Sequence, residues 1–254
     1  MSVWVVVPCF DEAERLDGAA FVELAAHVDR LVFVDDGSAD ETAAVVNRLV
    51  DTHPGRIELV SLPHNVGKAE AVRIGMLTAI ERGASIVGYL DADLATPVGE
   101  MRRLIEIAAA QPHRTAVLGS RVALLGHTVR RRPTRHYLGR LYATAASLAL
   151  GVPVYDTQCG AKVFRVGTPL QSALADPFPD RWSFDVELLA RLLADPNQSA
   201  DPLLEVPLRE WRDVDGSSVG AWSGGRAVWA LVGLRRRIRR VRSAVGGDRR
   251  PPTS

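Results

Sequence analysis

Cysteine is nearly absent from this sequence of 254 residues, in which Cys9 and Cys159 are the only two. Two isolated cysteines exclude a disulfide framework and a cysteine-rich zinc site, so we expect a protein of the reducing cytoplasm. A basic segment ahead of the first apolar run is also missing, because Met1 and Ser2 lead directly into "VWVVVP". We therefore expect no secretory signal peptide.

Long uncharged stretches are missing too. The longest one, residues 141–155, has 15 residues and contains Gly151 and Pro153. A helix needs about 20 apolar residues to cross a bilayer, so we expect no membrane span. The stretch is compatible with a buried core helix and with a contact to a membrane surface, and the sequence leaves both open.

The net charge of the whole chain is only +1, but its charged residues are unevenly distributed. Residues 226–254 contain nine arginines and one acid, Asp248, so a basic tail follows an acidic body. No internal repeat or long linker divides the remainder. We predict one domain over residues 1–225 and a basic amphipathic appendage over 226–254. The segment 224–242 begins apolar and ends rich in arginine, which is typical of a helix lying in a membrane interface.

Apolar, β-branched runs alternate with helical patterns in the first half of the chain. Strands without polar alternation, buried on both faces of a sheet, are predicted at 3–7, 31–34, 57–62, 86–90 and 115–119. Helices are predicted between them, at 13–28, 39–50, 67–82 and 98–110. A capping box of Ser38 and Glu41 is expected to open the second helix. This order predicts a doubly wound, mostly parallel α/β sheet flanked by helices.

Beyond residue 120 the pattern is less regular. A basic stretch at 130–136 leads into a helix-like run that ends at Leu150. A further strand is predicted at 161–166, a helix at 183–194 and an extended segment at 203–211.

Polar and acidic residues follow four successive predicted strands. In an open α/β sheet ligands collect at the carboxyl ends of the strands, so these residues should meet at one edge. Asp91 and Asp93 would repel each other there unless a cation offsets them, and a hard divalent ion with oxygen ligands does so. The alternative is that they are ordinary strand-end acids, or that Asp93 caps the helix near Pro97. The convergence of four loops favours a site for Mg²⁺ or Mn²⁺.

Several of these segments resemble a known family. "VVVPCFDEAERL", "FVDDGSADET", "HNVGKAEAVRIGM" and "YLDADLATP" are similar to the nucleotide-sugar half of family 2 glycosyltransferases with the GT-A fold. "GSR", "DTQCGAKVFR" and "RWSFDVELLAR" resemble the dolichyl- or polyprenyl-phosphate β-glucosyltransferase branch, close to dolichyl-phosphate mannose synthases. The resemblance covers roughly residues 3–215.

The resemblance implies a donor site for a sugar nucleotide, formed by Pro8, Asp11, Glu12, Asp35, Asp36, Lys68, Asp91, Ala92 and Asp93. It places Asp35 at the base and Asp36 at the ribose. Lys68, at a helix N-terminus, would meet the diphosphate, although a solvated surface lysine is the alternative. Asp93 would ligate the metal and Asp91 would support the sugar or the metal. Ala95 replaces the Gln of the mannose synthases, which favours the glucosyl branch.

The resemblance also implies an acceptor site. Arg121, Arg131 and Arg135 would clasp a phosphate, to which the planar arginine fork can donate two hydrogen bonds. A solvated charge run is the alternative for Arg131 and Arg135. A sugar or acceptor pocket is expected from Asp156, Gln158, Lys162 and Trp182. Cys159 is expected to be packed and unreactive.

The expected reaction follows from these assignments. The catalytic residues would be Asp91, Asp93, Arg121 and Asp185, and the product a β-linked polyprenyl or dolichyl phosphate sugar. A phosphate monoester has a second pKa near ~6 and attacks the sugar C1 with inversion without needing a base. If the acceptor is a hydroxyl, Asp185 is the candidate base.

The donor is expected to be UDP-glucose, with GDP-mannose as the alternative. A non-catalytic membrane adaptor with the same fold is a third possibility, against which Asp91, Asp93, Lys68 and Arg121 argue. The basic tail suggests peripheral attachment to an anionic membrane, at its cytoplasmic face. No nucleic-acid partner is expected, because aromatic residues do not alternate with the arginines.

Overall fold

The computed structural model describes residues 1–130, 133–179, 183–196, 198–199 and 201–214, and leaves out the side chains of 130–139 and 141. The predictions for Arg131, for Trp182 and for the 226–254 appendage therefore lie outside the described residues, as does the boundary at 225. Of Arg135, only the position of its backbone in a helix is described.

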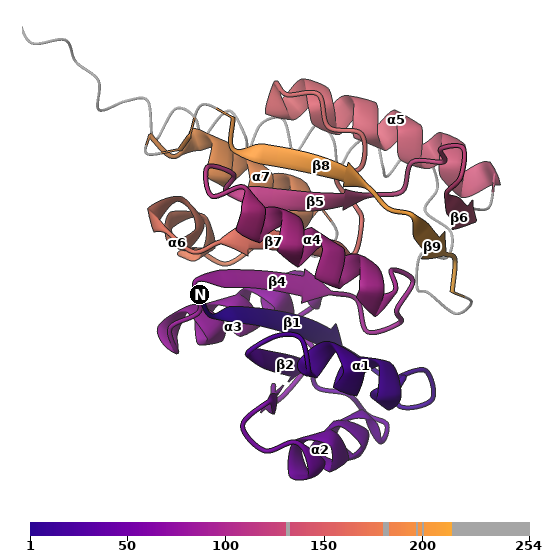
Figure 1. The fold of residues 1–254 in the computed structure, drawn as a ribbon, viewed down its shortest axis with the longest axis vertical. Coiled ribbons are helices and arrows are strands. Elements are labelled where there is room, and N and C mark those ends of the chain that lie inside the picture. The colour runs from indigo at the N-terminus through magenta and orange to yellow at the C-terminus, as the bar shows by residue number, and fades with distance from the viewer. Residues whose placement is uncertain (131–132, 180–182, 197, 200, 215–254) are drawn as a thin grey trace, which may run out of the picture.

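Seven strands form one sheet in the order β3-β2-β1-β4-β7-β5-β8 (Figure 1). Their bounds are β1 Val3–Cys9, β2 Arg30–Asp35, β3 Ile57–Ser61, β4 Ile86–Leu90, β5 Ala116–Ser120, β7 Ala161–Arg165 and β8 Leu203–Pro207. All neighbours are parallel except β7, which runs antiparallel to both β4 and β5. The predicted doubly wound, mostly parallel α/β sheet is confirmed.

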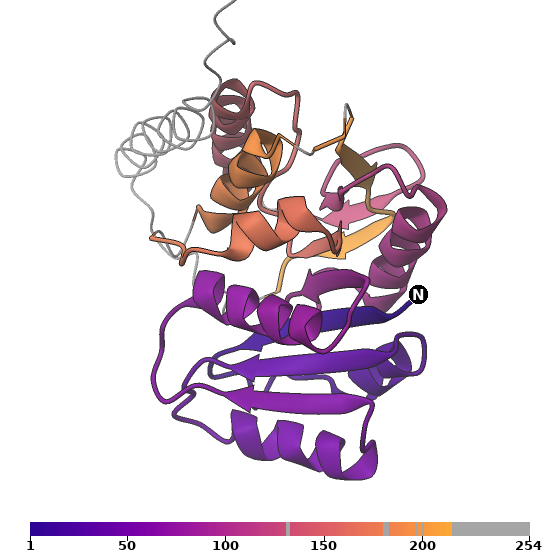
Figure 2. The same ribbon diagram turned by 90° about the vertical axis from the view of Figure 1, so that its left-hand side faces the viewer.

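Helices cover both faces of this sheet. They are α1 Gly18–Ala25, α2 Thr42–Thr52, α3 Lys68–Glu81, α4 Val98–Ala110, α5 Pro133–Leu150, α6 Thr168–Leu174 and α7 Phe184–Ala194. Alternate residues of β1 point to opposite faces, so Val6 packs with α3 and Val5 packs with α1 and α4. Figure 2 shows α6 and α7 packed against each other near α5.

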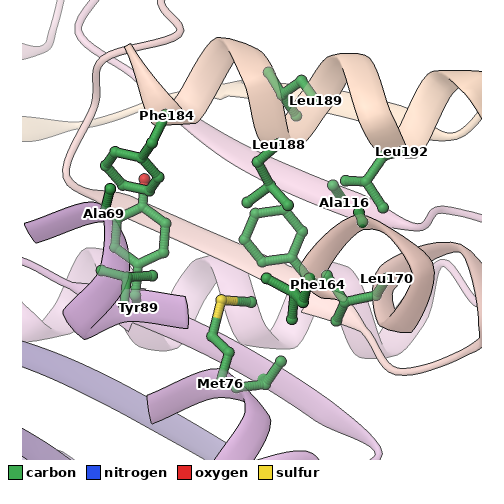
Figure 3. Close-up of a cluster of buried hydrophobic side chains, with 14 of the residues drawn as sticks. Ala69, Met76, Tyr89, Ala116, Phe164, Leu170, Phe184, Leu188, Leu189 and Leu192 are labelled. Atoms are coloured by element: carbon green, nitrogen blue, oxygen red, sulfur yellow. The ribbon is translucent and has the colours of Figure 1, made fainter. Parts of the chain in front are cut away.

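Among the described residues, the face covered by α3, α5, α6 and α7 holds most of the buried aromatic side chains. Tyr89 of β4 stacks on Phe164 of β7, with ring centroids 6.4 Å apart, and also contacts Phe184 of α7. Met76 and Leu188 close the cluster from the two sides (Figure 3). This packing fixes α7, and with it the start of that helix, against the end of β4.

Two local predictions are wrong. The first helix begins at Gly18 and not at residue 13, because the carboxylate of Asp17 caps it by accepting from the backbone N–H of Ala20. The capping box of Ser38 is not formed, since α2 begins at Thr42 and the Ser38 hydroxyl donates to Asp35.

A second, two-stranded sheet lies beyond the end of β5 (Figure 1). It pairs β6, Thr128–Arg130, with β9, Glu210–Arg212, in parallel. On α5, Tyr142, Ala146 and Leu150 are buried, as the core-helix interpretation requires, while Leu148 is exposed. Among the described residues, no helix combines the length and apolar character that a bilayer crossing requires.

Candidate active site

The loops that follow β1 and β2 are locked to each other at the carboxyl edge of the sheet. The Asp11 carboxylate accepts from the backbone N–H of Ala39 at 2.8 Å, and the Asp11 N–H donates to Ser38 Oγ at 3.0 Å. The next N–H, of Glu12, donates to Thr42 Oγ1 at 2.8 Å. Asp11 has a φ of 51°, an uncommon conformation for a residue with a side chain, which these bonds stabilise.

Asp36 supports the third loop of the edge. Its buried carboxylate accepts from the backbone N–H groups of Val66 and Gly67, at 2.7 and 2.8 Å. Gly37 has a φ of 69°, and a Cβ there would lie 2.6 Å from the backbone of His64. The β2 end thus holds the loop before α3 in place, and the ribose role predicted for Asp36 gains no support from these contacts.

Three other predicted donor residues are placed at this edge. Asp35 is buried, and its Oδ1 accepts from the Ser38 N–H at 3.1 Å. Pro8 pairs in register with Val34, beyond Val6, the last residue of β1 that pairs with β4. Its missing N–H therefore costs no bond to β4. The side chain of Ala92 is buried in the core, so only its backbone can face a ligand.

Asp91 directly follows β4 and pairs with the first residue of α3. Lys68 Nζ lies 2.5 Å from Asp91 Oδ1. Partial burial favours the neutral amine, but the carboxylates of Asp91 and Asp185 raise the pKa of Lys68 above its ordinary value. The position of Asp91 depends on Gly160, where a Cβ would lie 2.1 Å from Asp91 Oδ2. The loop after β4 and the start of α3 therefore meet at the Asp91–Lys68 ion pair.

Asp93 is half-buried next to Asp91. Its Oδ1 accepts from the Ala95 N–H at 3.0 Å, and the N-cap of α4 is Pro97, so the alternative that Asp93 caps this helix is wrong. Desolvation and the charge of Asp91 raise the pKa of Asp93. Desolvation also raises the pKa of Glu12. Arg15 opposes this increase, whereas the charges of Asp93 and Asp91 add to it. Three carboxylates thus repel one another at this edge.

This repulsion is what a divalent cation would relieve. Among the described residues, no three His, Cys, Asp or Glu side chains are arranged to hold a metal by themselves. A Mg²⁺ site needs only one or two protein carboxylates, because substrate phosphates and waters complete the octahedron. Asp93 and Asp91 fit that donor set, and Asp93 fits it better because Lys68 already pairs with Asp91.

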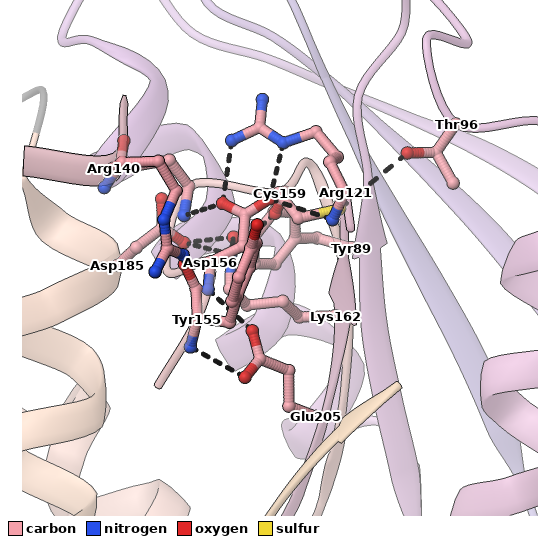
Figure 4. Close-up of polar contacts among 11 residues, drawn as sticks. Tyr89, Thr96, Arg121, Arg140, Tyr155, Asp156, Cys159, Lys162, Asp185 and Glu205 are labelled. Carbon is pink, nitrogen blue, oxygen red and sulfur yellow. Dashed lines mark hydrogen bonds and ion pairs between the residues drawn. The ribbon is translucent and has the colours of Figure 1, made fainter. Parts of the chain in front are cut away.

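Arg121, at the end of β5, is clasped by Asp156 (Figure 4). Its Nε and Nη2 donate to the two carboxylate oxygens at 2.6 and 2.8 Å, and its backbone N–H donates to the same group at 3.0 Å. Burial alone would lower the pKa of Arg121, but the Asp156 charge raises it above its ordinary value. Nη1 takes part in neither side-chain bond. The guanidinium also lies over the Trp211 ring, 5.4 Å from its centroid.

Lys162, predicted for the pocket, and Asp185, predicted as a catalytic residue, form a buried polar cluster with Tyr89. The Lys162 side chain is 0% exposed, and its Nζ donates to Asp185 Oδ1 at 2.8 Å, to Tyr89 Oη at 2.8 Å and to the Cys159 carbonyl at 2.6 Å. The Tyr89 hydroxyl donates to the same Asp185 oxygen. Burial, together with the Asp185 charge, raises the pKa of Tyr89 well above its ordinary value. The ammonium of Lys162 and the carboxylate of Asp185 therefore neutralise each other inside a hydrogen-bonded network (Figure 4).

Glu205 of β8 holds the backbone at Tyr155 and Asp156, in the segment between Arg121 and Lys162. Its carboxylate accepts from the N–H groups of Tyr155 and Asp156, at 2.7 and 2.6 Å. The Gln158 N–H donates to the Asp156 carboxylate at 3.1 Å. Burial raises the pKa of Cys159 to about 11, so this thiol is packed and protonated at neutral pH.

The model of the family described as "Glycosyl transferase family 2" matches residues 4–167, more than half of the chain. The chain belongs to this family. The resemblance seen in the sequence is confirmed, and the edge that carries Asp91 and Asp93 lies within the matched residues.

Relatives of this family 2 glycosyltransferase act on dolichyl and polyprenol phosphates, according to their names. A dolichyl-phosphate β-glucosyltransferase of Trichomonas vaginalis is 33% identical over 84% of this chain and 65% of its own length. One of Drosophila melanogaster is 31% identical over 86% of this chain and 69% of its own length. The polyprenol monophosphomannose synthase of Mycolicibacterium smegmatis is 27% identical over 95% and 90%. The chain thus spans about two thirds of the glucosyltransferases and nearly all of the mannose synthase.

Solved structures confirm the GT-A fold of this glycosyltransferase. The glucosyl-3-phosphoglycerate synthase of Mycobacterium tuberculosis, in complex with Mn²⁺, UDP and its product, matches with a TM-score of 0.58 and 17% identity, over 98% of this chain and 81% of its own. The mannosyltransferase PcManGT of Pyrobaculum calidifontis, in complex with GDP-mannose and Mn²⁺, matches with a TM-score of 0.52 and 19% identity, over 98% and 76%.

Sequence reasoning missed Tyr89, Glu205 and Gly160 in this glycosyltransferase. A signal existed for Tyr89, since a tyrosine in an otherwise aliphatic buried strand needs a partner for its hydroxyl. It also lies two residues before Asp91, hence on the same face of the strand. Glu205 and Gly160 gave no such signal, because their partners come from distant parts of the chain.

Proposed function

We propose that this glycosyltransferase moves a hexose from a sugar nucleotide to a polyprenyl or dolichyl phosphate and forms a β-linked lipid phosphate sugar. The names of the relatives support this acceptor class. UDP-glucose is the first choice of donor, because two of these relatives are β-glucosyltransferases. GDP-mannose is the alternative, because a relative that matches over 90% of its own length is a mannose synthase.

The engagement of Asp185 is the observation that carries the choice of acceptor. A hydroxyl acceptor needs a base, and Asp185 was the candidate. Its Oδ1 accepts from both Lys162 and Tyr89 inside the core, which leaves that oxygen poorly placed to take a proton. A phosphate monoester needs no base, because it is largely ionised at neutral pH. Arg121 at the same edge supplies the donors that a phosphate would need.

The remaining residues take the following roles. Asp93, with Asp91, would hold Mg²⁺ or Mn²⁺, which when bound neutralises charge on the departing diphosphate. Lys68 and the N-terminus of α3 bind the same diphosphate. Arg121 orients the acceptor phosphate through the guanidinium edge that Asp156 does not occupy. The attack on the sugar C1 then inverts its configuration.

The function is tested by following the label from radioactive UDP-glucose or GDP-mannose. Each donor is incubated with detergent-solubilised polyprenyl phosphate or with 3-phosphoglycerate, a water-soluble hydroxyl acceptor. We expect acid-labile label in the organic phase when polyprenyl phosphate is the acceptor, and no transfer of label to 3-phosphoglycerate. Label transferred to 3-phosphoglycerate, or released only as free sugar, would reject the proposal.

Replacing Arg121 with Lys should raise the KM for polyprenyl phosphate by about 10–100-fold, because a lysine cannot hold Asp156 by two bonds and keep a donor edge for the phosphate. The KM for the sugar nucleotide should stay unchanged. Arg114→Lys is the matched control, since Arg114 bonds the carbonyls of Asp201 and Leu203 at the opposite end of β5. A larger effect on donor KM than on acceptor KM would contradict the assignment.

Deleting residues 226–254 should lower recovery on anionic vesicles more than turnover of detergent-solubilised acceptor. The reason is electrostatic, since each arginine near an anionic surface adds about 1 kcal/mol. A shorter deletion, of 243–254, is the control, because it keeps seven of the nine arginines. Equal vesicle recovery for the full-length chain and both truncations would refute a membrane role of the tail and weaken the proposed location at the cytoplasmic membrane face.

A further inference from the structure

The segment between Arg121 and β6 displays two leucines to solvent. Leu125 is 103% exposed and Leu124 is 45% exposed. They sit in a tight turn, because the His127 N–H donates to the Leu124 carbonyl at 3.1 Å and Gly126 has a φ of 81°. This conformation at the third position is typical of a type II turn and favours glycine. The turn therefore has a built geometry that points apolar side chains outward.

The turn is fixed to the scaffold that carries Arg121. His127 Nδ1 lies 2.8 Å from the Leu208 carbonyl, and the Thr128 N–H donates to the Arg209 carbonyl at 2.7 Å. The following strand, β6, pairs with β9, where Val129 is in register with Trp211. The Trp211 ring lies beneath the guanidinium of Arg121. The two leucines and the acceptor arginine thus belong to one connected unit.

The charges around this turn favour an anionic lipid surface. Arg209, just before β9, and Arg212, at its end, are exposed, as is Glu210 between them. In the sequence, the turn is followed by a run of three arginines at 130–132. Leucine beside arginine is the composition that inserts into a membrane interface, where the apolar side chains enter the acyl region and the cations meet lipid phosphates.

We propose that the turn Leu124–His127 inserts its leucines into the bilayer and sets Arg121 at the level of the lipid phosphates. Leu125 lies four positions after Arg121, so at most about 14 Å of chain joins them. Interfacial segments bury their apolar face about 5–10 Å deep. Arg121 then lies near the headgroups, where the phosphate of a membrane-embedded acceptor is found. The proposal rests on the function proposed above and names the surface from which the acceptor is taken.

A fluorescent probe on Leu125 tests this insertion. Leu125→Cys is labelled with the environment-sensitive dye NBD, which spares the native cysteines because Cys9 and Cys159 are buried. We expect blue-shifted, brighter emission on adding vesicles of phosphatidylcholine and phosphatidylglycerol. Asp51→Cys, exposed on α2 at the far end of the molecule (Figure 1), is the control and should not respond.

An unchanged emission at position 125, or an equal response at position 51, would overturn the proposal. A shift that depends on protein concentration without vesicles would also overturn it, because it would indicate contact between two copies of the chain. As a second measurement, the Leu124→Ser/Leu125→Ser variant should bind the same vesicles at least about 10-fold more weakly. Equal binding by this variant and the unaltered chain would reject the insertion.

The proposed function is assayed separately in the unaltered protein with detergent-solubilised acceptor. Sugar transfer without a probe response would reject the inserting turn and leave the function standing. A probe response without transfer to polyprenyl phosphate would reject the function and leave a lipid-binding turn.

Discussion

Replacing Asp93 with Asn should lower sugar transfer by at least about 100-fold, since several kcal/mol of charge stabilisation depend on a bound metal. The amide keeps the bond to the Ala95 N–H but removes the negative charge that a divalent cation needs. The loss is measured as kcat/KM for the sugar nucleotide at saturating lipid acceptor and metal. Near-normal activity in this variant would reject the metal assignment.

The stability of Asp93→Asn separates this loss from misfolding. Burial and Asp91 raise the pKa of Asp93 in the folded state. Protonation of Asp93 therefore stabilises the folded state. This contribution is fully present below the unfolded-state pKa and is lost as the pH rises through the folded-state pKa. At neutral pH the metal-free variant should therefore be at least as stable as the parent, by thermal unfolding. Asp51→Asn, exposed on α2, is the matched control and should keep full activity.

Replacing Lys162 with Met should lower the free energy of unfolding by about 3–5 kcal/mol. The change removes the ammonium that faces Asp185 inside the core. Of the two donors to Asp185 Oδ1 described above, only the Tyr89 hydroxyl then remains. Urea unfolding measures the loss as a lower midpoint at an unchanged slope.

The double variant Lys162→Met/Asp185→Asn tests whether the buried charge is the cause. Removing both charges should recover much of the stability, because an isolated buried charge costs more than a neutral pair. The four proteins of this cycle yield the interaction energy of the pair directly. A double variant as unstable as Lys162→Met would show that packing, and not charge, holds this part of the core.

The fold followed from the sequence where apolar runs were long and uninterrupted. The five strands of the first half appear at their predicted places, since a run buried on both faces admits few other structures. Helix starts were less predictable, because Asp17 and Ser38 could each form a local bond in several ways. The position of β7 between β4 and β5 was not predicted either, because the run 161–166 carries no sign of its antiparallel neighbours.

The site was predictable as a set of strand ends but not as a set of contacts. Asp91 and Lys68 come together as the topology requires, since both lie at the carboxyl edge. The bond of Tyr89 to Asp185 joins residues 96 positions apart, and that of Arg121 to Asp156 spans 35. Such pairs depend on how β7 and α7 pack on the sheet, which local patterns do not encode. The same packing buries Asp185 against Lys162 and Tyr89, while its catalytic role stays a prediction.

A crystal structure with a nucleotide and a metal tests the central claim most directly. Crystals are soaked with UDP-glucose, or with GDP-mannose, and Mn²⁺, and the metal is located by its anomalous scattering. The account predicts one manganese peak in coordination contact with the Asp93 carboxylate and with the diphosphate, and Lys68 beside the same phosphates. A nucleotide bound without metal at that edge, or manganese bound only elsewhere, would contradict it.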